Sequence, residues 1–140
     1  MAASVIQSQK SERWDVVYAG VHRIDLVAFS GPHVVRVQVK STVGPRKAAR
    51  GSLFKYEFLV GSMVNQKRKP SGRYGSRRKL QPHECDIVAL VALDKRLCRF
   101  MPIEDCTKIH WRFLPKDFTL KTQEKTLKEA FAKYEDLTER

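Results

Sequence analysis

Two adjacent strand-like runs joined by a tight turn constrain the fold of this chain more than any other feature. Residues 23–29 read RIDLVAF and residues 34–42 read VVRVQVKST, with a Gly-Pro pair between them that favours a turn. In the second run Val35, Val37 and Val39 alternate with polar residues, which is the period of a strand with one face in a core. The two runs therefore predict neighbouring strands of one sheet.

Periodicity along the rest of the chain predicts the remaining elements. A continuous apolar run, CDIVALVAL at 85–93, is typical of a strand buried on both faces. Apolar residues at helical spacing within 125–137 predict an amphipathic helix laid over the sheet. Further strands are expected at 14–20, 52–60 and 98–103, and a short helix or turn at 2–13. We therefore expect a single domain over residues 1–140 with an α/β fold, a mixed central β-sheet flanked by helices.

The positive charge of the chain is concentrated in one segment. The formal net charge is +12, and residues 40–79 contain twelve Lys and Arg but a single acid, Glu57. The stretch NQKRKPSGRYGSRRK adds Gly, Ser and Pro, so we expect a basic loop at about 61–82 that binds a phosphate backbone. A nuclear-localisation patch is the alternative function of such a run. The residues expected to bind DNA are Arg46, Lys47, Arg50, Lys67, Arg68, Lys69, Arg73, Tyr74, Arg77, Arg78 and Lys79.

Three polar residues lie within the first pair of strands: Asp25, Gln38 and Lys40. An unpartnered polar group taken out of water costs about 1–3 kcal/mol, so such residues need a structural or a chemical reason. A chain that turns between the two strands can bring all three near one point. Asp25, Gln38 and the Val39 carbonyl then offer the hard oxygen ligands that Mg²⁺ prefers. Lys40 would lie where it stabilises charge on a phosphate or an attacking water.

Structural explanations of the same residues remain open from the sequence alone. Asp25 can pair with Arg23 or Arg36, which needs no metal. Gln38 and Lys40 can form the solvent face of an edge strand. These explanations need no catalytic site.

Other site chemistries find less support in the sequence. Cys85, Cys98, Cys106, His83 and His110 lack the spacing of a zinc site, so we expect reduced thiols that act as small hydrophobes. There is no Gly-rich nucleotide loop, so no nucleotide cofactor is expected. The first residues lack the apolar core of a signal peptide, and no apolar run could span a membrane, so we expect a cytoplasmic protein.

The pattern D-L-V … V-Q-V-K resembles the core signature of the PD-(D/E)XK nucleases, in which an Asp on one strand precedes an acid-x-Lys on the next. Asp25 and Lys40 match that signature, while Ile24 replaces the usual Pro and Gln38 replaces the usual Asp or Glu. The Q-x-K variant resembles the branch of group I intron-associated and phage-borne homing endonucleases. The resemblance covers residues 14–42 well and a later hairpin more loosely.

This resemblance implies a site-specific homing endonuclease that hydrolyses phosphodiester bonds in double-stranded DNA with Mg²⁺, for which Mn²⁺ substitutes. It implies Asp25, Gln38 and Lys40 as catalytic residues and Asp25, Gln38 and Val39 as metal ligands. Glu12 is either an additional acid of the metal site or a surface acid, because it directly precedes the first strand. One site per chain and two strands to cut imply a homodimer or homotetramer. The alternatives are a Holliday-junction resolvase of the same fold and a non-catalytic DNA-binding module.

Overall fold

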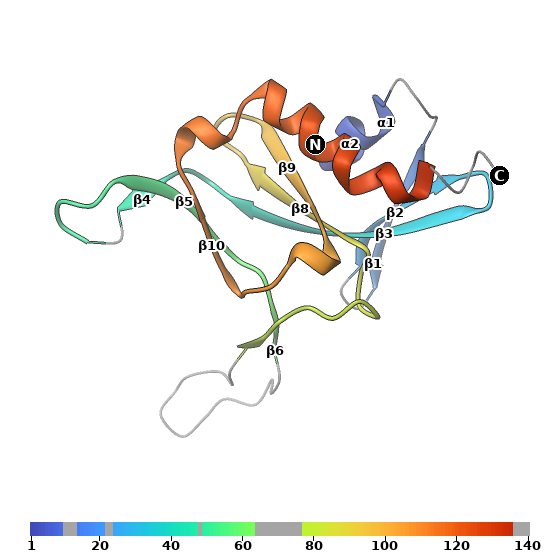
Figure 1. Ribbon diagram of the computed structural model, residues 1–140, viewed down its shortest axis with the longest axis horizontal. Coiled ribbons are helices and arrows are strands. Elements are labelled where there is room, and N and C mark those ends of the chain that lie inside the picture. Colours follow the sequence, from blue (N-terminus) through green and yellow to red (C-terminus); the bar gives the residue numbers. More distant parts are fainter. Residues whose placement is uncertain (10–13, 22–23, 48, 64–76, 136–140) are drawn as a thin grey trace.

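A mixed five-stranded sheet forms the centre of the molecule (Figure 1). The computed structural model describes residues 1–9, 14–21, 24–47, 49–63 and 77–135. In spatial order the strands are β1 (Asp15–Val21), β2 (Ile24–Ser30), β3 (His33–Thr42), β8 (Ile87–Ala92) and β9 (Leu97–Pro102). β3 and β8 run parallel, and the other neighbours are antiparallel. The predicted mixed sheet is therefore confirmed, with β3 at its centre.

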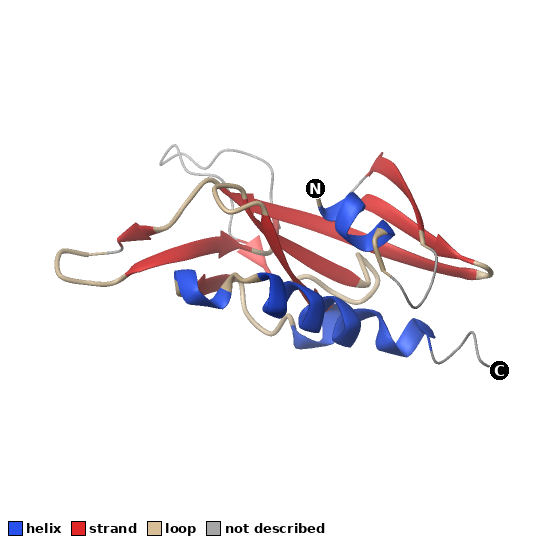
Figure 2. Ribbon diagram, turned by 90° about the horizontal axis from the view of Figure 1, so that it is seen from above, coloured by secondary structure: helices blue, strands red, loops and turns tan. Residues whose placement is uncertain are grey.

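One face of this sheet is covered by two helices, α1 (Ala2–Gln7) and α2 (Leu120–Glu135) (Figure 2). α2 begins after Thr119, whose Oγ1 accepts a hydrogen bond from the Thr122 N–H (3.1 Å). In return, the Thr119 N–H donates to Thr122 Oγ1 (3.0 Å), so two backbone donors at the helix start are satisfied. Within the described ranges, every helix falls short of the length and apolar character that a membrane span requires.

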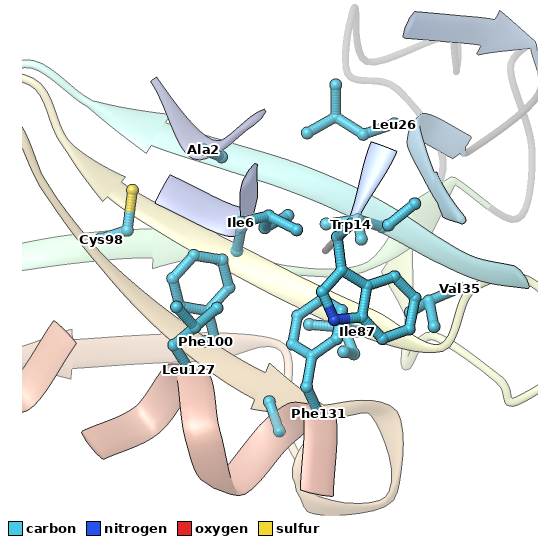
Figure 3. Close-up of a cluster of buried hydrophobic side chains, with 14 of the residues drawn as sticks. Ala2, Ile6, Trp14, Leu26, Val35, Ile87, Cys98, Phe100, Leu127 and Phe131 are labelled. Carbon is cyan, nitrogen blue, oxygen red and sulfur yellow. The ribbon is translucent and has the colours of Figure 1, made fainter. Parts of the chain in front are cut away.

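The helices enclose a first hydrophobic core against the sheet (Figure 3). Val35 and Val37 of β3, Ile87 of β8 and Phe131 of α2 are fully buried there. Trp14 packs edge-on against Phe131, with ring centroids 5.1 Å apart. The face of α2 that the sequence predicts to be apolar is thus the face that contacts the sheet. Truncating such an aromatic side chain to alanine costs about 3–5 kcal/mol.

The opposite face of the sheet is covered by a second, smaller sheet and not by helices, which corrects the expectation of flanking helices. Its strands, in the order β10-β5-β4, are β10 (His110–Phe113), β5 (Phe54–Leu59) and β4 (Arg46–Lys47). Two single-turn 3₁₀ helices, η1 (Ile103–Asp105) and η2 (Pro115–Asp117), flank β10 in the chain. A second core forms here from Tyr56, Phe58, Val88, Leu90 and Phe118, among others. β5 and β10 therefore cover the second face of the central sheet, beside β3.

The described ends of the basic segment form a short ribbon of β6 (Ser62–Met63) and β7 (Arg77–Arg78). A Cβ atom on Gly61 would lie 2.8 Å from the Arg78 carbonyl oxygen. The close approach of these two segments of the backbone therefore requires glycine at position 61. The predicted loop at about 61–82 therefore begins and ends in paired strands. Residues 64–76 lie outside the described residues.

Candidate active site

Asp25 lies where the pairing between β2 and β3 ends. The last backbone pair of this ladder is Leu26 with Val37. One residue beyond it, Asp25 Oδ2 accepts a hydrogen bond from the Val39 N–H at 2.7 Å. The carboxylate thus takes the place of a β2 carbonyl as the partner of this donor. Because a charged acceptor strengthens such a bond, it fixes the Asp25 side chain against β3.

The Val39 carbonyl points toward the same edge of β3 as the Val39 N–H. The Arg36 and Thr42 carbonyls accept hydrogen bonds at 2.9 and 3.0 Å from N–H groups that flank β8. Backbone groups of successive strand residues alternate between the two edges, so even-numbered residues of β3 face β8 and odd-numbered residues face β2. The Val39 carbonyl therefore lies on the same side of β3 as the Asp25 carboxylate.

Gln38 is a buried polar residue in the middle of the sheet. It is 6% exposed, and the described part of the chain contains no other buried polar or charged residue. Gln38 lies beside Val88 of β8, on the face that the smaller sheet covers. Its Oε1 is enclosed and has no hydrogen-bond partner among the described residues. An oxygen left in this state costs about 1–3 kcal/mol, which a bound cation would recover.

Two of the structural explanations for these residues are wrong. Arg36 pairs with Asp86 and not with Asp25, through Nε–Oδ2 and Nη2–Oδ1 contacts of 3.1 and 3.0 Å. Asp86 also accepts the Arg36 backbone N–H at 2.8 Å, so it ties the start of β8 to β3. β3 has a neighbour on each side, so its polar residues do not form the face of an edge strand. Arg23, the other candidate partner of Asp25, lies outside the described residues.

Lys40 lines a polar hollow of about 320 Å³ between β3 and the smaller sheet. Ser41, Thr42 and Arg46 share the lining, together with residues of β5 and β10. Asp25 lines a different hollow, beside α1, and the two hollows have no lining residue in common. The structure therefore joins Asp25 to the Val39 backbone, while Gln38 and Lys40 lie on the face of β3 that the smaller sheet covers.

Glu57 and His110 line the Lys40 hollow, and sequence reasoning did not assign them to the site. Glu57 lies on β5 and accepts a hydrogen bond from Arg112 Nε of β10 at 3.0 Å. β10 is four residues long, so its sequence carries too little alternation to reveal it. Its pairing with β5 is what brings these side chains next to Lys40.

Three oxygen donors of the kind that a hard cation such as Mg²⁺ prefers occur on β3 and at the end of β2. They are the Asp25 carboxylate, Gln38 Oε1 and the Val39 carbonyl. The described ranges contain no cluster of three or more His, Cys, Asp or Glu side chains placed to hold a metal. A site here would therefore depend on amide and carbonyl oxygens as well as one carboxylate. Glu12, the additional acid considered from the sequence, lies outside the described residues.

Comparison with solved structures finds a similar fold in a bacterial homing endonuclease, I-Ssp6803I. The TM-score is 0.51 over 74% of this chain, and the sequences are 16% identical. The similarity between the two proteins is therefore a similarity of fold. The match spans 66% of the endonuclease chain, slightly less than two thirds of it. No protein-family model matches the sequence, and no curated protein matches it.

The cations expected to bind DNA fall into two described groups. Arg46, Lys47 and Arg50 are exposed on the hairpin that contains β4 and β5. Arg77 and Lys79 are exposed at β7, whereas Arg78 holds Glu84 through a 2.7 Å Nη2–Oε1 contact. The other expected contacts lie outside the described residues: Lys67, Arg68, Lys69, Arg73 and Tyr74.

The three cysteines are buried in the two cores. Cys98 belongs to the core under the helices, and Cys85 and Cys106 belong to the core under the smaller sheet. The central sheet therefore separates Cys98 from the other two. Burial raises the pKa of Cys85 to about 12 and that of Cys98 to about 11, so these thiols stay protonated at neutral pH.

Proposed function

We propose that this chain is a metal-dependent endonuclease of the PD-(D/E)XK type that cleaves double-stranded DNA at specific sites, as homing endonucleases do. The observation that carries the proposal is the arrangement around Val39. Asp25 is hydrogen-bonded to the Val39 backbone, and the side-chain oxygen of Gln38, the preceding residue of β3, is buried without a partner among the described residues. The similar fold of a bacterial homing endonuclease adds support.

In this proposal Asp25, Gln38 and Val39 hold Mg²⁺, for which Mn²⁺ substitutes. The chemistry that the ion supplies when bound is polarisation of the scissile phosphate and activation of a water. Asp25 alone brings a full negative charge, so we expect weak metal binding in the absence of DNA. Glu12 remains a proposed additional acid.

Lys40 supplies positive charge on the same face of β3 as Gln38. In its hollow, Arg46 and the hydroxyl groups of Ser41 and Thr42 are further groups that can donate hydrogen bonds to phosphate oxygens. Charge that develops on a phosphate during hydrolysis is best stabilised by donors already in place. We therefore assign Lys40 to the phosphate that is cleaved and the rest of the hollow to the adjacent DNA backbone.

Binding to DNA is assigned to the basic segment between residues 40 and 79. Its excess of Lys and Arg suits a phosphate backbone, and the described cations among Arg46, Lys47, Arg50, Arg77 and Lys79 are exposed. Because each chain carries one proposed site, we expect a homodimer or homotetramer, in which two sites cut the two strands. The apolar face of α2 packs against its own sheet, so a contact between chains through α2 would use its outer, charged face.

Incubating the purified protein with a duplex library of randomised sequence, supercoiled plasmid and four-way junction DNA, with Mg²⁺, Mn²⁺ or a chelator, tests this proposal. We expect Mg²⁺-dependent cleavage of duplex DNA at one or a few positions. Cleavage confined to the junction would replace the proposal by a Holliday-junction resolvase. Tight binding to DNA without cleavage in either Mg²⁺ or Mn²⁺ would leave a non-catalytic DNA-binding module.

A further inference from the structure

The hairpin of β4 and β5 projects beyond the body of the protein. Figures 1 and 2 both show it extending past the end of the central sheet. Arg46 pairs with Lys55 and Lys47 pairs with Phe54, so its base is a regular antiparallel ribbon. We call the described residues 46–47 and 49–55 the β4–β5 ribbon.

The β4–β5 ribbon combines positive charge with exposed apolar side chains. It carries four cations and no acid: Arg46, Lys47, Arg50 and Lys55. Phe54 is 53% exposed and Leu53 is 67% exposed, although Phe54 continues the buried face of β5 on which Tyr56 and Phe58 lie. Lys47 Nζ lies 4.9 Å from the centre of the Phe54 ring. Two neighbouring exposed apolar side chains on a projecting, basic element suit a surface that contacts a partner.

We propose that the β4–β5 ribbon enters the major groove of duplex DNA and reads the bases next to the cleavage position. This inference rests on the proposed function. The charge of the ribbon complements a DNA backbone, and a two-stranded ribbon has the dimensions that the major groove admits. Arginine reads guanine edges there, and apolar side chains such as Leu53 and Phe54 contact the thymine methyl group. In this arrangement Lys47 is freed from the Phe54 ring to contact a phosphate.

For a ribbon that runs along the DNA axis, the spacing of residues on β5 sets the expected position of the bases that are read. Glu57 shares the hollow of Lys40, so it marks the level of the proposed catalytic site on β5. Phe54 and Leu53 are three and four residues away along an extended chain, a distance of roughly 10–13 Å. Stacked bases are about 3.4 Å apart, so the ribbon would read base pairs about three to four steps from the scissile phosphate. Arg46 lines the hollow itself and would contact the backbone closer to the cut.

Cleavage of a duplex library with randomised sequence tests the inference, because sequencing the products gives the base preference at each step from the cut. Wild-type protein should show a preference about three to four base pairs away. Leu53→Ala and Phe54→Ala should each reduce that preference by about tenfold and keep the preferences elsewhere. Leu120→Ala is a matched control, since Leu120 is 66% exposed but lies on α2, and it should keep the whole profile.

A second selection separates this inference from the nuclease proposal. Wild-type protein in chelator is used to capture duplexes from the same library by binding alone. If captured duplexes show a base preference that Leu53→Ala removes, the ribbon reads DNA even if no cleavage occurs. Profiles that Leu53→Ala and Phe54→Ala leave unchanged would overturn the inference while leaving a nuclease intact. A change of oligomeric state with unchanged base preference would assign the ribbon to a contact between chains, and would also overturn it.

Discussion

Replacing Gln38 with methionine is expected to stabilise the metal-free protein. Methionine has nearly the same length and shape, but it removes the enclosed Oε1 that has no partner in the described structure. Relief of one unpaired buried amide oxygen is worth about 1–2 kcal/mol. For a chain of 140 residues, this corresponds to a rise in melting temperature of about 3–7 °C. A residue at a binding site is thus expected to cost stability until its ligand is present.

The same substitution should abolish the response of the protein to Mg²⁺. A ligand that binds only the folded state adds about 1.4 kcal/mol to its stability at ten times the dissociation constant. We expect this increase for wild type and a larger one for Gln38→Glu at the same Mg²⁺ concentration, since a carboxylate adds charge to the site. Gln38→Glu should retain some cleavage, whereas Gln38→Met and Gln38→Ala should lose both the increase and the cleavage.

Thermal unfolding followed by circular dichroism, in chelator and over a range of Mg²⁺ concentrations, measures both effects. Gln123→Met is a suitable contrast, because Gln123 Oε1 accepts a hydrogen bond from the Cys98 N–H at 2.9 Å. Its loss leaves a strand donor unpaired and should lower the melting temperature. If Gln38→Met also melts lower than wild type in chelator, the reasoning about the unpaired oxygen is refuted. If its Mg²⁺ response equals that of wild type, Gln38 is not a ligand.

Three further predictions concern the basic loop, the thiols and a buried tyrosine. Replacing Lys67, Arg68 and Lys69 with alanine should weaken binding to all DNA sequences alike and lower the salt dependence by close to one unit of slope per lost phosphate contact; unchanged affinity at several salt concentrations would exclude them from the interface. The buried cysteines should react with a thiol reagent at neutral pH only as the chain unfolds, and rapid reaction of the folded protein would contradict their burial. Burial, then the hydrogen bond to Asp94, raises the Tyr56 pKa from 10.0 to about 12. The stability from this raised pKa is complete below pH 10 and is lost as the pH rises through about 12. Denaturant midpoints of wild type and Tyr56→Phe should therefore converge over that range, and parallel curves would contradict the linkage.

The elements with a strong local period could be predicted from the sequence. Val35 and Val37 alternate with polar residues in β3, β8 is a continuous apolar run, and the buried face of α2 follows helical spacing. These patterns arise because each element buries one face, or both, against the same sheet. The order of the central strands and the second, smaller sheet could not be read in this way, since they depend on contacts between distant segments.

The candidate site was predictable in part for the same reason. Spacing placed Asp25, Gln38 and Lys40 on neighbouring strands, but it did not reveal that Asp25 binds the Val39 N–H, which depends on where the β2–β3 ladder ends. The partner of Arg36 lies 50 residues away in the chain, so local reasoning kept the wrong pairing open. The charges of the β4–β5 ribbon were visible, whereas its projection from the body was not.

Single-turnover cleavage by Asp25→Asn and Lys40→Ala, compared with wild type, tests the central claim most directly. Asparagine keeps an oxygen that can accept the Val39 N–H but removes the negative charge, and alanine removes the amine of Lys40. We expect each variant to cleave at least about a hundredfold more slowly in Mg²⁺, while binding DNA nearly as tightly as wild type. Asp105→Asn, a substitution of an exposed acid outside the site, should cleave at the wild-type rate. Cleavage by Asp25→Asn at the wild-type rate would contradict the account.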